Sequence, residues 1–119
     1  MRKQTHLVIG ALAFFVYTYP LYLLLKIHTN TMLMSFFAVC FGSVMPDVLE
    51  PARTGSHRGL GHSRRAMKFS AEIFAISALI GLFSLCIPDL AMSYVVSGFF
   101  LGYAVHLLAD SITPAGLPR

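Results

Sequence analysis

The chain has 119 residues, of which 56% are hydrophobic and only 12% are charged. Soluble domains carry about 25% charged residues, so a soluble fold of this size would have too little polar surface to cover itself. Intrinsic disorder is excluded as well, because it requires low hydrophobicity and high net charge. The length allows one domain, and the composition predicts an all-α bundle of membrane-spanning helices.

Four blocks with almost no charge predict four transmembrane helices, at residues 7–25, 31–45, 69–87 and 90–109. About 20 helical residues cross the hydrocarbon core of a bilayer, so three of these blocks are long enough. The block at 31–45 is marginal, and a short span, a tilted span and a re-entrant helix are all compatible with it. The first block is expected to be retained, because no cleavage site of the secretory type follows it.

Turn and capping residues agree with four helices. We expect Asn30 and Thr31 to cap the second helix and Pro46 to end it. We expect Pro88-Asp89 to form the turn before the fourth helix, which Pro114 and Gly116 would stop.

The basic residues predict how the bundle is oriented. With four spans, all of the nine lysines and arginines except Lys26 fall on one side of the membrane. Positive loops face the cytoplasm, so we expect both termini and a loop at residues 46–68 to be cytoplasmic. This placement accounts for the net charge of +4 without nucleic-acid binding.

The same topology brings histidines and carboxylates to the cytoplasmic face. Ionisable groups at membrane depth are costly and are usually functional, and this mixture of donors suits zinc. The residues concerned are His6, Asp47, His57, His62, Glu72, His106 and Asp110.

His106 and Asp110 are four residues apart, so they share one face of the fourth helix and are predicted metal ligands. Gly98 and Gly102 continue this stripe. They would let a neighbouring helix approach closely, although ordinary helix packing explains them equally well.

The central loop contains His57 and His62, separated by a segment with two glycines, Gly59 and Gly61. Glycine permits backbone turns that other residues resist, so both imidazoles could face one metal ion. A basic loop lying on anionic headgroups is the alternative. Three loop arginines suit phosphate binding, or serve only as positive-inside residues: Arg58, Arg64 and Arg65.

Three further residues have two interpretations each. Asp47 is a metal ligand or general base, or else it pairs with Arg53. Glu72 is a general base or pairs with Lys68 one turn away. His6 is a ligand or supports one.

Four segments resemble those of the YdjM-like inner-membrane proteins: THLVIGA, GSVMPDV, HRGLGHS and GYAVHLLADSITPAG. This family is described as membrane-bound, metal-dependent hydrolases, some of them LexA-regulated. The resemblance covers nearly the whole chain. It implies that the metal and catalytic positions are His6, Asp47, His57, His62, His106 and Asp110.

The chain departs from the family pattern in two ways. The family commonly has a second acid two residues after the first, where this chain has Leu49, with Glu50 beside it. Many relatives also continue beyond the final glycine. This chain is therefore expected to be either a minimal member or one whose site is closed by a second copy or a partner.

These observations lead to two functional hypotheses. The first is a hydrolase with one divalent metal ion, most simply zinc, that acts on a lipid or another membrane-associated ester, phosphoester or amide. The second is a small membrane protein whose metal is structural and which forms part of a larger membrane assembly. A metal-ion or proton pathway is a weaker third hypothesis, because the outer halves of the helices contain few polar groups.

Overall fold

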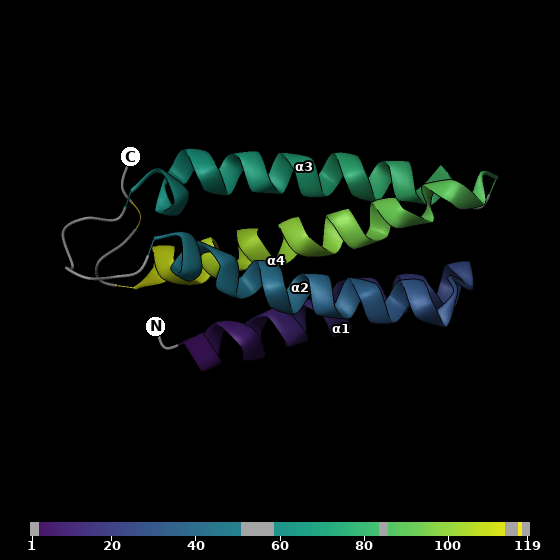
Figure 1. Cartoon of the computed structure of the whole chain (residues 1–119), viewed down its shortest axis with the longest axis horizontal. Helices are drawn as coiled ribbons and strands as arrows, with labels where there is room; N and C mark the ends of the chain where they lie inside the picture. The colour runs from purple at the N-terminus through teal and green to yellow at the C-terminus, as the bar shows by residue number, and fades with distance from the viewer. Residues whose placement is uncertain (1–2, 51–58, 84–85, 114–116, 118–119) are drawn as a thin grey trace.

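A computed structural model describes residues 3–50, 59–83, 86–113 and 117 of the chain. Four long helices lie side by side in a bundle whose long axis measures 48 Å (Figure 1). They are α1 (Lys3–Leu25), α2 (Thr29–Leu49), α3 (Arg64–Leu82) and α4 (Met92–Ile112). Two short 3-10 turns, η1 (Leu60–His62) and η3 (Pro88–Ala91), precede α3 and α4. The predicted all-α membrane bundle is confirmed.

Three of the described helical segments are long and apolar enough to cross a membrane: α1, α2 and residues Asp89–Ile112, which include α4. The marginal second block is therefore a helix of 21 residues, or about 32 Å at 1.5 Å per residue.

The third predicted span differs most from the structure. Instead of residues 69–87, α3 covers Arg64–Leu82. Its start is fixed by Ser63, whose hydroxyl accepts a hydrogen bond from the backbone N–H of Ala66 at 3.1 Å. The helix therefore begins among charged residues, which a search for apolar runs does not include.

The limits of α2 also differ from those expected. The helix starts at Thr29, with His28 at the N-cap position, rather than after a cap at Asn30 or Thr31. Pro46 does not end α2 but lies inside it. A helical proline removes one backbone hydrogen bond, and membrane helices tolerate this where neighbouring groups satisfy the freed backbone.

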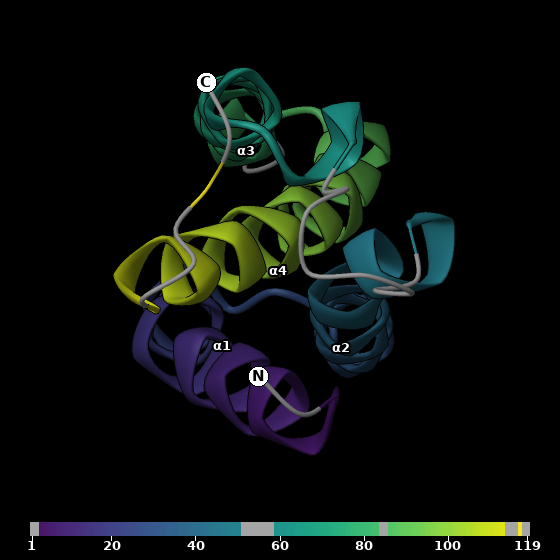
Figure 2. The same cartoon turned by 90° about the vertical axis from the view of Figure 1, so that its left-hand side faces the viewer.

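Helix α4 is the central element of the bundle. Figure 2 shows it between α3 on one side and α1 and α2 on the other, and it contacts all three. Small residues make these contacts close. A Cβ atom on Gly102 would collide with the backbone of Val39, and one on Gly42 would collide with the backbone of Phe99. The predicted glycine stripe of α4 thus packs against α2, as expected for membrane helices.

The large apolar side chains mostly face outward. Val16 and Leu24 are 79% and 77% exposed, whereas small polar residues such as Ser35 and Ser97 are buried. Lipid surrounds a membrane bundle, so outward apolar side chains carry no penalty there. Several polar side chains within the helices, among them those of His6 and His106, are instead turned toward the interior.

The alternating direction of the helices puts the start of α1, the end of α2, the start of α3 and the end of α4 at one end of the bundle (Figure 1). This is the end at which the sequence predicted the functional residues. That this end faces the cytoplasm stays a prediction.

Candidate metal centre

Ionisable side chains from four segments meet at this end of the bundle. We call them the polar cluster; its members are His6, Asp47, Glu50, His62, His106 and Asp110. His6 comes from α1, Asp47 from α2, and His106 and Asp110 from α4. Glu50 directly follows α2, and His62 ends η1. The cluster therefore depends on the bundle as a whole.

His106 has a fixed orientation. Its Nδ1–H donates a hydrogen bond of 2.7 Å to the backbone carbonyl of Ser43. A carbonyl only accepts, so Nδ1 carries the proton, and in a neutral ring the lone pair is on Nε2. That buried Nε2 has no hydrogen-bond partner among the described residues. It lies 3.4 Å from Asp110 Oδ2 and 3.6 Å from Asp47 Oδ1. A lone pair that faces two carboxylates is unfavourable unless a cation or a proton lies between them.

His6 stacks on His106, with ring centroids 3.7 Å apart and an interplanar angle of 24°. Its Nε2 lies 3.5 Å from Asp110 Oδ1, and its side chain is 1% exposed. Two stacked imidazolium rings would repel each other, so the arrangement favours neutral rings.

His62 completes the cluster from the loop side. Its Nε2 lies 3.4 Å from Asp47 Oδ1 and 3.9 Å from Asp110 Oδ2. Its Nδ1 faces Glu50 Oε2 at 3.2 Å, and Glu50 Oε1 accepts the backbone N–H of Gly61 at 2.9 Å. These contacts, above all the hydrogen bond from Gly61, hold the pKa of Glu50 below its usual range.

The residues that could hold a metal ion form two overlapping groups, His6–Asp47–His106 and His62–His106–Asp110. Within each group the donor atoms lie within 4.8 Å of one another. Around a tetrahedral zinc ion with bonds of about 2.0–2.1 Å, ligand atoms are about 3.4 Å apart. The distances from histidine Nε2 atoms to the oxygens of Asp47 and Asp110 run from 3.4 to 3.9 Å. Both groups require the single lone pair of His106 Nε2, so they suit one ion and not two.

The structure brings five of the predicted site residues together: His6, Asp47, His62, His106 and Asp110. Glu72 is exposed on α3, and no hydrogen bond or ion pair among the described residues links it to the cluster. Arg64 and Arg65 are exposed at the start of α3. His57 and Arg58 lie outside the described residues.

Sequence reasoning missed the contacts made by Glu50 and Tyr103. The hydroxyl of Tyr103 donates a hydrogen bond of 3.0 Å to the carbonyl of Gly61. Glu50 was visible as an acid three residues after Asp47, but nothing in the sequence indicated that Gly61 and His62 are its partners.

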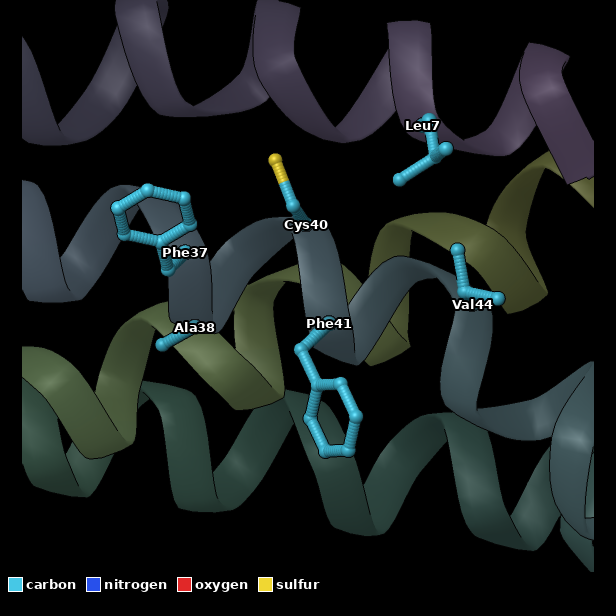
Figure 3. Close-up of a pocket in the computed structure, with 6 residues that line it drawn as sticks. All are labelled: Leu7, Phe37, Ala38, Cys40, Phe41 and Val44. Atoms are coloured by element: carbon cyan, nitrogen blue, oxygen red, sulfur yellow. The ribbon is translucent and has the colours of Figure 1, made fainter.

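An apolar groove of about 630 Å³ lies between α1 and α2 (Figure 3). It is lined by Leu7, Phe37, Ala38, Cys40, Phe41 and Val44. Leu7 directly follows His6, and Val44 lies three residues before Asp47. The groove is therefore lined by residues close in sequence to two members of the polar cluster, and none of its lining residues is itself a cluster member.

Comparison with known proteins identifies the family. The family model described as "YdjM inner membrane protein" matches residues 1–119. The chain belongs to the YdjM family. Together with the three apolar helices, this makes it a multi-pass protein of the inner membrane.

Two curated relatives are similar to part of the chain. Inner membrane protein YdjM of Escherichia coli (strain K12) is 38% identical over 69 residues, which cover 56% of this chain and 31% of the relative. The protein of the same name from Shigella flexneri matches with the same values. The chain thus spans about a third of the length of these relatives. No solved structure matches it.

Proposed function

We propose that this YdjM-family protein is a metal-dependent hydrolase that acts at the cytoplasmic membrane interface. The observation that carries the proposal is the environment of His106. Its hydrogen bond to Ser43 leaves a buried Nε2 lone pair facing the carboxylates of Asp47 and Asp110, and a divalent cation would turn this repulsion into attraction. Zinc is the proposed ion, because imidazole and carboxylate donors at these spacings suit it.

His62, His106 and Asp110 are the proposed ligands, with His6 as a further donor. A catalytic zinc site uses three protein ligands and leaves one position open. When bound, the ion supplies Lewis-acid activation of a water molecule and of the substrate oxygen.

Asp47 is the proposed general base. Its side chain is 18% exposed, whereas that of Asp110 is 4% exposed, so Asp47 is the carboxylate that solvent and substrate reach. A carboxylate within hydrogen-bond reach of water can accept its proton, and protonated Asp47 can then return that proton to the leaving group.

The proposed substrate is a lipid or another membrane-associated ester, phosphoester or amide. The apolar groove, which Leu7 and residues of α2 line, offers space for an acyl chain. Arg64 and Arg65 lie on the segment that follows His62, and guanidinium groups bind phosphate in a bidentate manner. These two features favour a lipid phosphoester within this class.

A structural metal is the second candidate, and the burial of the cluster favours it. His6, His62, His106 and Asp110 are each no more than 3% exposed. A closed tetrahedral site with four protein ligands stabilises a fold without catalysing a reaction.

Metal analysis of the protein purified in mild detergent tests both candidates. We expect about one zinc ion per chain in the wild type and loss of that ion in His106→Ala and Asp110→Ala. The matched controls are His28→Ala and Asp89→Ala, because both residues are exposed at the other end of the bundle. Wild-type protein without stoichiometric metal would end both candidates.

Turnover of vesicle-bound phosphoesters and esters then separates the two roles. Hydrolysis that disappears in Asp47→Asn while the metal is retained supports the enzyme. Full metal occupancy without turnover of any of these substrates supports the structural role.

A further inference from the structure

Glu50 occupies the C-cap position of α2 and reaches across to the loop that carries His62. Its two carboxylate oxygens have separate partners: Oε1 accepts the N–H of Gly61 at 2.9 Å, and Oε2 lies 3.2 Å from His62 Nδ1. One side chain therefore holds both the backbone and the imidazole of adjacent residues.

The partner atom determines which tautomer His62 adopts. An ionised carboxylate only accepts hydrogen bonds, so Nδ1 of His62 must be the protonated nitrogen. The lone pair then lies on Nε2, the nitrogen 3.4 Å from Asp47 Oδ1. A carboxylate behind a histidine fixes the ring orientation and raises its basicity toward a metal.

The two loop glycines leave the space that this carboxylate occupies. A Cβ atom on Gly59 would lie 2.5 Å from Glu50 Oε1, and one on Gly61 would lie 3.1 Å from the Glu50 carboxyl carbon. Tyr103 holds the same loop from the other side, through its hydrogen bond to the Gly61 carbonyl. Glycine at positions 59 and 61 thus leaves room for the Glu50 carboxylate, and at Gly59 the reason is this close approach and not the backbone conformation, since its φ is an ordinary −79°.

We propose that Glu50 is a positioning residue, which aims His62 Nε2 at the metal by binding Gly61 and His62 Nδ1 together. This inference rests on the proposed metal site. It gives Glu50 a role distinct from that of the ligands. Glu50 Oε2 faces Nδ1 of His62, whereas Nε2 of His62 is the nitrogen that would bind the metal.

Cobalt(II) titration of the full chain in detergent tests this role, since cobalt replaces zinc and its absorption reports ligand number. We expect Glu50→Gln to keep a stoichiometry of about one ion per chain and to weaken cobalt binding about 10- to 100-fold. In a His62→Ala background, Glu50→Gln should weaken binding no further, because its effect passes through His62. The control is Glu72→Gln, which removes the same charge from an exposed residue and should leave the affinity unchanged.

Gly61→Ala provides a second variant that leaves the Glu50 charge in place. Its new Cβ would press on the Glu50 carboxyl group and on the Tyr103 hydroxyl, at 3.1 and 3.3 Å, and we expect weaker cobalt binding of the same kind. If Glu50→Gln does not yield folded protein, the cobalt affinity of Gly61→Ala tests the role of Glu50 in its place.

The outcomes are distinguishable. Failure of the wild type to bind cobalt overturns the metal site itself. Wild-type binding with unchanged affinity in Glu50→Gln or, where that variant does not fold, in Gly61→Ala overturns only the role of Glu50. A further loss of cobalt affinity when Glu50→Gln is added to His62→Ala also overturns the role of Glu50, because Glu50 would then act by a route other than His62.

Discussion

The two ends of the bundle contain the same kinds of residue but use them differently. At one end, histidines and acids from four segments meet in a buried cluster. At the other end, His28 and Asp89 are exposed, and no ion pair among the described residues joins them. The difference lies in the close packing of α4 against α2, which buries His106 and Asp110 between the helices. Burial by the bundle, and not the presence of donor residues, defines the candidate site.

The largest expected effect therefore comes from Gly102, one turn before His106. Gly102→Ala places a Cβ atom against the backbone of Val39 and 2.8 Å from the backbone nitrogen of Ser43, so the helices must separate. We expect a loss of about 1–3 kcal/mol of stability together with most of the bound metal. Thermal unfolding in detergent and metal analysis measure the two effects.

Gly98→Ala is the matched control for this experiment. The residue lies one turn farther from the cluster on the same face, and its Cβ would be 3.0 Å from the Ser35 carbonyl oxygen. It should cost less stability and leave the metal content near that of the wild type. Equal metal loss in both variants would contradict the idea that packing at Gly102 specifically orders the site.

The contrast also explains which parts could be predicted from the sequence. The four-residue spacing of Gly102, His106 and Asp110 is a property of one helix, and the structure has all three buried on α4. The charged start of α3 was not predicted, because a search for apolar runs passes over Arg64, Arg65 and Lys68, although these residues are good helix formers.

Non-local contacts limited the prediction of the site. The hydrogen bonds between Glu50 and Gly61 and between Tyr103 and Gly61 join segments that are distant along the chain. No local pattern specifies them, since they depend on how α2, η1 and α4 meet. His6 was predicted only as a ligand or supporting group, and its stacking on His106 likewise follows from packing between helices.

Removal of metal should lower the stability of the folded chain. A ligand at about 100 times its Kd stabilises the folded state by about 2.7 kcal/mol, which is on the order of 10 °C in Tm for a chain of this size. We expect a chelator to lower the Tm of the wild type and of His28→Ala by this amount. His106→Ala, which lacks a central donor, should show no chelator effect, and an undiminished shift in that variant would place the ion elsewhere.

A smaller effect is expected from filling the apolar groove. Val44, three residues before Asp47 in the sequence, lines it, and Val44→Trp adds bulk where an acyl chain would lie. Turnover of long-chain lipid substrates should fall several-fold, with little change for short-chain soluble analogues that do not need the groove. Val96→Trp on the exposed surface of α4 is the control. Equal losses for both substrate lengths would indicate that Val44 acts on the cluster itself.

The smallest effect should come from the exposed arginines at the start of α3. Arg64→Gln with Arg65→Gln should leave metal content unchanged, because neither side chain contacts the cluster through an ion pair or hydrogen bond of the described residues. Exposed charge pairs contribute about 0–1 kcal/mol, so a few-fold rise in KM for phosphoesters is expected, with little change for neutral esters.

Added salt should reduce this difference in KM between the two substrate classes, since it screens exposed charges. Lys26→Gln, at the opposite end of the bundle, should have neither effect. A rise in KM that is equal for both substrate classes would mean that the arginines act through the loop near His62 and not through phosphate.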